Sequence, residues 1–96
     1  MKLQKSILQE LSAIKPELSR RFFVDKIGLF GSVTRDDFSE NSDIDVIVAF
    51  TKPVGLEFID LADFLEEKFK RKVDLVSLTG LKKHYFEAIK NKIIYV

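Results

Sequence analysis

The chain has 96 residues, of which 46% are hydrophobic and 32% are charged, and its formal net charge is +1. A chain of this length has room for one domain, residues 1–96, built around one core. The near-neutral charge argues against a dedicated nucleic-acid-binding protein, so direct nucleic-acid binding is not expected. The absence of cysteine excludes disulfides and thiolate metal sites. No apolar run approaches the ~18 residues that a membrane span requires. We therefore expect a cytoplasmic protein without membrane association.

The first half of the chain predicts helices alternating with strands. Residues 2–21 place apolar side chains at helical spacing, and Pro16 within this stretch is expected to kink the helix or divide it into two. Residues 24–30 are a short apolar run that predicts a strand ending at Gly31 and Ser32. Residues 33–38 predict a short helix capped by Ser32. Residues 44–50 predict the clearest strand of the sequence.

The second half continues the alternation. Residues 58–70 carry a second apolar helical stripe, residues 72–77 predict a third strand, and residues 81–92 predict a third helix. The apolar tail, residues 93–96, is expected to add a short strand or to dock on the core. The predicted order α-β-α-β-α-β-α indicates an α+β fold, with a small mixed or antiparallel sheet packed with helices.

The residues most suggestive of chemistry are three aspartates on or beside the predicted strands. Side chains alternate along a strand, so Asp43 and Asp45 are expected to point the same way. Two adjacent carboxylates repel each other unless a cation lies between them, and oxygen ligands suit Mg²⁺ or Mn²⁺. If the third strand lies beside the second, Asp74 completes a three-carboxylate cluster of the kind that supports two-metal phosphoryl transfer.

A second group of residues could bind phosphate. Gly31 permits close approach of the backbone to a phosphate group, and the Ser32 hydroxyl and the N–H groups of a helix start can donate to phosphate oxygens. Arg35 could clamp the leaving phosphates. Each feature alone has a structural interpretation: a turn and cap, a surface pair of acids, or a surface charge. The combination points to nucleotide chemistry.

The segment GSVTRDDFSENSDIDVIVAF, with Asp74 on a later strand, resembles the signature of the nucleotidyltransferase superfamily that includes DNA polymerase beta. The short chain is similar to the minimal nucleotidyltransferases. The resemblance implies that Asp43 and Asp45 hold both metal ions and that Asp74 holds the catalytic ion and helps to activate the acceptor hydroxyl. It also implies a triphosphate site made by three residues: Gly31, Ser32 and Arg35.

Two positions depart from the family pattern Gly-Ser-x-Ala-Arg-Gly. Thr34 replaces the alanine, which is a small change, and Asp36 replaces the final glycine. Asp36 either faces the site, where its charge would weaken nucleotide binding, or faces solvent.

The resemblance also implies a function. Members of this size act as antitoxins that transfer AMP from ATP to a tyrosine of a HEPN-domain RNase toxin, so the expected partners are ATP and such a toxin. One alternative is a catalytically degenerate binding module that neutralises its partner by docking alone. Another is a transferase with a small-molecule or RNA acceptor. Tyr85 and Tyr95 could accept the group in a self-modification, but nothing in the sequence singles either out.

Overall fold

The computed structural model describes residues 2–35, 38–39 and 41–96, and a four-stranded sheet forms its centre. The strand order is β3-β2-β1-β4. The strands are β1 (Val24–Phe30), β2 (Ile44–Phe50), β3 (Val73–Ser77) and β4 (Ile94–Tyr95). β1 pairs antiparallel with β2 and β4, whereas β2 pairs parallel with β3. The sheet is therefore mixed, and the α+β fold predicted from the sequence is confirmed.

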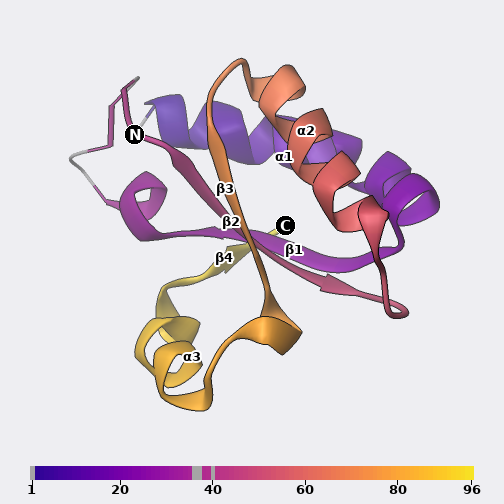
Figure 1. Cartoon of the computed structure of the whole chain (residues 1–96). Coiled ribbons are helices and arrows are strands. Elements are labelled where there is room, and N and C mark those ends of the chain that lie inside the picture. Colours follow the sequence, from indigo (N-terminus) through magenta and orange to yellow (C-terminus); the bar gives the residue numbers. More distant parts are fainter. Residues whose placement is uncertain (1, 36–37, 40) are drawn as a thin grey trace.

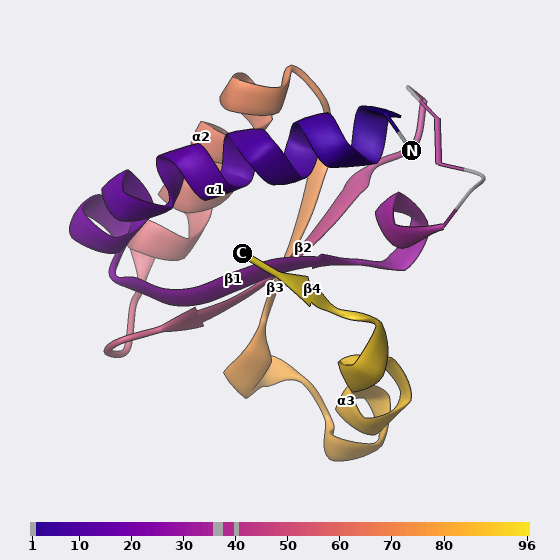
Figure 2. The same ribbon diagram turned by 180° about the vertical axis from the view of Figure 1, so that it is seen from behind.

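Helices cover the two faces of this sheet unequally. The long helices α1 (Lys2–Phe22) and α2 (Leu56–Phe69) lie together on one face, and the short helix α3 (Lys83–Ile89) lies on the opposite side (Figures 1 and 2). Three short 3₁₀ segments, Gly31–Thr34, Leu78–Gly80 and Lys90–Lys92, connect these elements. No helix among the described residues is both long enough and apolar enough to cross a membrane.

The main core lies between the sheet and the two long helices. The fully buried side chains of Leu11 and Leu18 in α1 and of Leu61 and Leu65 in α2 belong to one hydrophobic cluster with the inward side chains of β1 and β2. Burial of each such leucine contributes about 1.5–3 kcal/mol. This core holds the first three strands in a fixed relation, so side chains on the other face of the sheet stand on a rigid support.

Pro16 was expected to kink the first helix or to divide it into two, and it does not divide it. α1 runs without a break from Lys2 to Phe22 with Pro16 inside it. The proline removes the N–H that would bond the carbonyl of Ser12, and both residues are exposed, so water can satisfy that carbonyl. Leu11 and Leu18 on either side are fully buried, which holds both halves against the core.

Two other helix predictions were wrong in detail. The helix predicted over residues 33–38 with Ser32 as its cap is not found in the described part of that range: the backbone makes one 3₁₀ turn over Gly31–Thr34 without a side-chain cap, and Arg35 is extended. Asp36 and Asp37 lie outside the described residues. The helix predicted over residues 81–92 is shorter, because α3 ends at Ile89 and a 3₁₀ turn follows it. The apolar tail forms the short strand β4, which confirms the first of its two expected structures.

Candidate active site

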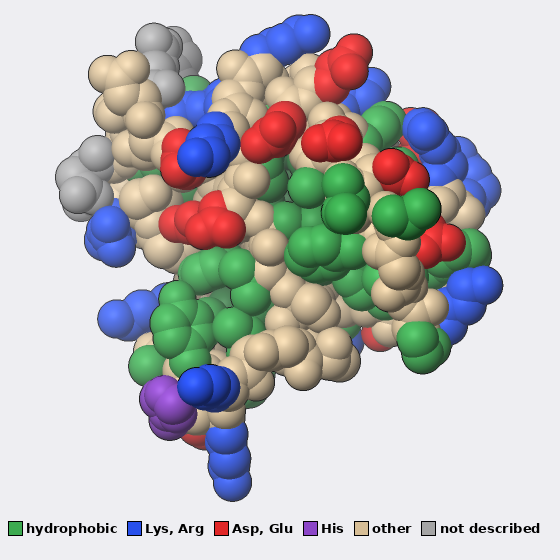
Figure 3. Space-filling view, in the orientation of Figure 1, with side chains coloured by type: hydrophobic (Ala, Val, Ile, Leu, Met, Phe, Trp, Pro, Cys, Tyr) green, Lys and Arg blue, Asp and Glu red, His purple; other side chains and the backbone are tan. Residues whose placement is uncertain are grey.

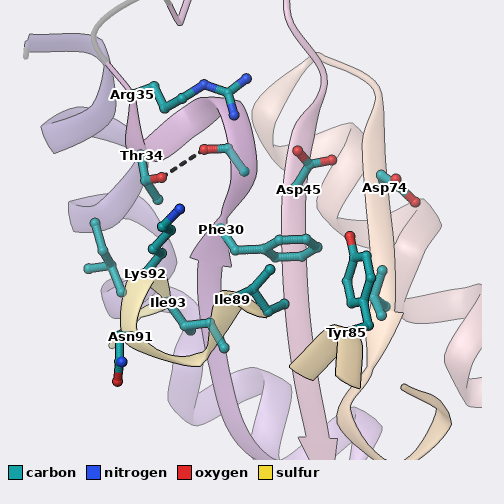
Figure 4. Close-up of a pocket in the computed structure, with 13 residues that line it drawn as sticks. Phe30, Thr34, Arg35, Asp45, Asp74, Tyr85, Ile89, Asn91, Lys92 and Ile93 are labelled. Carbon is teal, nitrogen blue, oxygen red and sulfur yellow. Dashed lines mark hydrogen bonds between the residues drawn. The ribbon is translucent and has the colours of Figure 1, made fainter. Parts of the chain in front are cut away.

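A pocket of about 660 Å³ lies between the sheet and the C-terminal segment that contains α3 (Figure 4). Four of the six residues singled out in the sequence line this pocket, namely Gly31, Arg35, Asp45 and Asp74. The other lining residues come from the end of β1, the 3₁₀ turn, β3 and the chain after residue 84: Phe30, Thr34, Val76, Tyr85, Ile89, Asn91, Lys92, Ile93 and Ile94. In the space-filling view, acidic side chains border a hydrophobic area on the side where α3 lies (Figure 3).

Two carboxylates come together here because of the strand register. Asp45 of β2 is the direct partner of Asp74 in the parallel pairing with β3, so their side chains leave the sheet on the same face. Asp45 is also paired with Phe30 across the antiparallel ladder, which places the β1 end beside it. The predicted adjacency of the second and third strands is therefore confirmed.

Asp45 is the more enclosed of the two aspartates, and its environment disfavours the charged form. Burial raises the pKa of the Asp45 carboxyl above its ordinary value, and the negative charges of Asp74 and Asp43 raise it further. A hydrogen bond from the Ser32 backbone N–H and the positive charge of Arg35 act in the opposite direction, and the net pKa shift is upward. A carboxylate in this position gains from any additional cation.

Gly31 allows the 3₁₀ turn to approach Asp45 closely. Its φ of +69° lies in the left-handed region, which favours glycine. A Cβ at this position would overlap the Asp45 carboxylate oxygen and lie 3.1 Å from Asp45 Cγ. The turn that follows is braced by the Thr34 hydroxyl, which donates a 2.7 Å hydrogen bond to the Gly31 carbonyl (Figure 4). Glycine is therefore required here by both backbone conformation and space.

Ser32 and Asp43 lie beside the pocket and are not among the residues that line it. The Ser32 hydroxyl lies 3.4 Å from the Asp43 carbonyl oxygen, which joins the turn after β1 to the residue before β2. Both residues act on Asp45, Ser32 through its backbone N–H and Asp43 through its charge. The sequence-predicted residues thus form one neighbourhood, with Asp43 at its exposed edge.

The predicted three-carboxylate cluster is not formed as a converged ligand set. Among the described residues, no three His, Cys, Asp or Glu side chains are arranged so that they could hold a metal ion together. In Figure 4 the Asp45 carboxylate points toward the space beside β3, whereas the Asp74 carboxylate points outward from that strand. The backbone register aligns the two residues, but a change of the Asp74 side-chain torsions is needed to bring its oxygens next to those of Asp45.

Arg71 anchors the loop that leads into Asp43. Its Nη2 atom donates hydrogen bonds to the carbonyls of Ser39 and Ser42, the latter at 2.7 Å, and its guanidinium lies 4.7 Å from the centre of the Phe38 ring. The Ile44 N–H also donates to the Lys72 carbonyl at 3.0 Å. The loop before β2 is thus tied to the turn before β3. Arg71 was not among the functional residues predicted from the sequence.

The C-terminal segment also contributes residues to the pocket, and their place there was not predicted from the sequence. Tyr85 and Lys92 point into it from α3 and the following turn, the first toward the aspartates and the second toward Thr34 (Figure 4). From the sequence, Tyr85 was a possible acceptor for self-modification, but no pattern placed it at the site. Lys92 had no local signal, since its position depends on the end of α3 at Ile89.

Comparison with known proteins agrees with this geometry. Residues 11–96 match the family described as the nucleotidyltransferase domain. The protein adenylyltransferase MntA of Thermococcus cleftensis is 40% identical over 87 residues, which cover 90% of this chain and 88% of that protein. A solved structure assigned as a minimal nucleotidyltransferase matches with a TM-score of 0.80 at 29% identity, covering 95% of this chain and 93% of its own.

A further match is a chain in the complex of a tri-AMPylated HEPN toxin of Shewanella oneidensis with an MNT antitoxin. Its TM-score is 0.65 at 25% identity, and the match covers 96% of this chain and 70% of that one. The family match spans most of the chain, including the Gly-Ser turn and all three aspartates. The chain therefore belongs to the nucleotidyltransferase domain family.

Proposed function

We propose that this chain is a protein adenylyltransferase that moves AMP from ATP to a tyrosine hydroxyl of a HEPN toxin. By this modification it acts as an antitoxin. The observation that carries the proposal is the pocket in which the turn at Gly31, the cation Arg35 and the paired aspartates Asp45 and Asp74 meet. The 40% identity to the MntA adenylyltransferase supports AMP as the transferred group. The complex of an MNT antitoxin with a tri-AMPylated HEPN toxin supports the partner class.

The two sides of the pocket suit different parts of the substrate. Arg35 and Lys92 supply positive charge beside the turn, where the backbone of Gly31 and Ser32 can approach a triphosphate. Phe30 and Ile89 supply apolar surface below the aspartates. We assign nucleotide binding to Gly31 and Arg35 of the first side and to the adjacent Ser32, and propose Lys92 as an additional phosphate contact.

The acidic side suits a hard divalent cation, Mg²⁺ or Mn²⁺. Its donors are carboxylate oxygens. Burial, and after it the charges of Asp74 and Asp43, raise the pKa of Asp45, and a bound cation would favour its charged form. Asp43, Asp45 and Asp74 would hold the ion after Asp74 turns inward. When bound, such an ion neutralises phosphate charge and lowers the pKa of an attacking hydroxyl. A binding readout independent of activity is the rise in melting temperature on addition of Mg²⁺, expected for the wild type and reduced in the D43N/D45N variant.

The test is intact-mass spectrometry of the protein encoded by the adjacent gene, which we expect to be a HEPN toxin, incubated with this chain, ATP and Mg²⁺. A mass gain of one or more AMP units on the partner is expected with the wild type and not with the D43N/D45N variant. Peptide mapping then identifies the acceptor residue, which is expected to be a tyrosine.

The same experiment tests the binding-module alternative. A stable complex formed by both the wild type and D43N/D45N, with no mass gain in either sample, would replace the enzymatic proposal by neutralisation through docking. The residue that favoured this alternative, Asp36, lies outside the described residues.

A further inference from the structure

The chain contains two tyrosines that differ in one decisive respect. Tyr85 and Tyr95 are almost equally exposed, at 46% and 45%. Tyr85 lines the pocket that contains Asp45 and Asp74, whereas Tyr95 in β4 is not among its lining residues. The structure therefore separates two chemically identical side chains by their position relative to the candidate active site.

The orientation of Tyr85 is that of an acceptor. Its ring stands below the two aspartates and its hydroxyl end is directed toward them (Figure 4). The same pocket carries the cations Arg35 and Lys92 on its other side. An ATP molecule whose terminal phosphates bind these cations, as proposed above, would have its α-phosphate on the side of the aspartates and the Tyr85 phenol.

The surroundings of Tyr85 leave its side chain room to move. It belongs to a seven-residue helix in which no residue is buried, and that helix is bounded by 3₁₀ turns at Leu78–Gly80 and Lys90–Lys92. Since Tyr85 is substantially exposed, a change of its rotamer does not disturb the main core, which lies on the other face of the sheet. Small movements of the Tyr85 side chain toward a bound nucleotide therefore cost little free energy.

We propose that Tyr85 is a self-adenylylation site of this chain. The inference rests on the proposed adenylyltransferase function and adds an acceptor within the enzyme itself. The Tyr85 Oη atom attacks the α-phosphorus of ATP and forms a new O–P bond. The bond from that phosphorus to the oxygen that bridges to the β-phosphate breaks, and pyrophosphate leaves. The phenol proton passes to the carboxylate of Asp45 or, after it turns inward, of Asp74, and the product is a tyrosine–AMP phosphodiester.

Two other hydroxyls near the site are poorer acceptors. The Thr34 hydroxyl donates a 2.7 Å hydrogen bond to the Gly31 carbonyl and braces the turn. The Ser32 hydroxyl lies 3.4 Å from the Asp43 carbonyl, and Ser32 is not among the pocket-lining residues. Both are aliphatic alcohols, which are less acidic than a phenol and form the attacking oxyanion less readily. Tyr85 is therefore the favoured internal acceptor.

The experiment uses the full chain alone, without any partner protein. Wild type, Y85F, Y95F and D45N are each incubated with ATP and Mg²⁺, and intact mass and peptide mapping report the AMP group. We expect a gain of one AMP unit in the wild type and Y95F, mapped to Tyr85, and no gain in Y85F or D45N. Y95F is the matched control because it removes a phenol of equal exposure outside the pocket.

Each result has a defined meaning. AMP mapped to Tyr85 in the wild-type protein supports the proposal independently of any effect of Y85F on the pocket. AMP on Tyr95 or on another residue overturns it. A chain that adenylylates its HEPN partner in a parallel reaction but shows no mass gain itself also overturns it, while leaving the proposed function intact. Absence of AMP on both proteins rejects the self-modification and the proposed function together.

A concentration series tests whether the step occurs within one molecule. Tyr85 and the aspartates belong to the same pocket of the same chain, so the fraction modified at a fixed time should not change between dilute and concentrated protein. A fraction that rises in proportion to protein concentration would overturn the intramolecular step.

Discussion

Asp45 and Asp74 are direct partners in the parallel ladder of β2 and β3, so two carboxylates occupy facing positions on one side of the sheet. Like charges directly opposite on neighbouring strands destabilise a sheet. Here one of them, Asp45, is also partly buried, and burial is the main cause of its raised pKa. The fold therefore carries an electrostatic cost at the position where the proposed chemistry needs negative charge.

Replacement of Asp45 by Asn is expected to stabilise the protein while abolishing adenylyl transfer. The amide keeps an oxygen that can accept the hydrogen bond from the Ser32 N–H, and it removes the repulsion by Asp74 and Asp43. The expected gain in unfolding free energy at neutral pH is about 0.2–1 kcal/mol, measured by urea denaturation. The matched control is D60N, on the exposed surface of α2 and outside the pocket. A D45N protein less stable than the wild type would contradict this prediction.

The same residue predicts a pH dependence. Because the pKa of Asp45 is raised in the folded state, the native protein binds more protons than the unfolded chain between the ordinary value of 3.8 and the folded value. The contribution of Asp45 to stability therefore falls as pH rises through this window. The stability difference between D45N and the wild type should be smallest under acidic conditions and should reach its plateau at neutral pH. A difference that stays constant from acidic to neutral pH would contradict the pKa direction.

Gly31→Ala is expected to destabilise the fold and to impair the site. The alanine would be held at a φ of +69° with its Cβ against the Asp45 carboxylate. The backbone conformation alone costs about 1–3 kcal/mol. Urea denaturation measures the loss, and G80A serves as control because the nearest atom to its Cβ is 4.0 Å away and its φ is not positive. Equal stability of the two variants would show that the turn does not need glycine.

Much of the site could be predicted from the sequence because its parts follow local rules. The alternation along β2 and β3 and the apolar residues around Asp45 and Asp74 were enough to place both carboxylates on strands. The adjacency of those strands follows from the helical connection α2, which is long enough for a parallel crossover.

The rest depended on contacts that no local pattern shows. Tyr85 and Lys92 reach the pocket because α3 stops at Ile89 and the tail turns back to pair with β1. Arg71 acts on carbonyl groups about 30 residues earlier in the chain, and backbone acceptors carry no sequence signature. The direction of the Asp74 carboxylate is a rotamer choice, which the strand period leaves open.

Arg71→Lys is expected to lower adenylyl transfer more than its effect on stability would explain. Lysine keeps the charge but lacks the planar fork that reaches the Ser39 and Ser42 carbonyls while lying over Phe38. Loss of hydrogen bonds to a charged donor costs about 1.5–3 kcal/mol in stability. The loop before Asp43 should then loosen, which faster amide hydrogen exchange at Ser42 and Ile44 would report. R21K is the control, because Arg21 bonds the exposed Glu17 and not this loop. Unchanged exchange in R71K would refute the anchoring role.

Gly28→Ala should detach the C-terminal strand and thereby open the pocket. A Cβ at Gly28 would lie 2.8 Å from the Ile94 carbonyl oxygen and 3.1 Å from Tyr95 Cα, and both are backbone atoms that cannot rotate away. β4 must therefore move from β1, and with it Ile93 and Ile94, which line the pocket wall. Overpacking of this kind costs about 1–3 kcal/mol.

The readout for Gly28→Ala is local. The Val96 N–H, which donates to the Ile27 carbonyl at 3.1 Å, should exchange with solvent faster than in the wild type, while amides of α1 and α2 keep their relative protection. ATP binding should weaken in parallel, because the pocket loses one wall. Both aspartates remain in the pocket. If Val96 remains protected and ATP binding still falls, the pocket effect of Gly28 acts through β1 and not through β4. Protection of Val96 together with unchanged ATP binding would show that the sheet absorbs the extra methyl group without moving its edge strand.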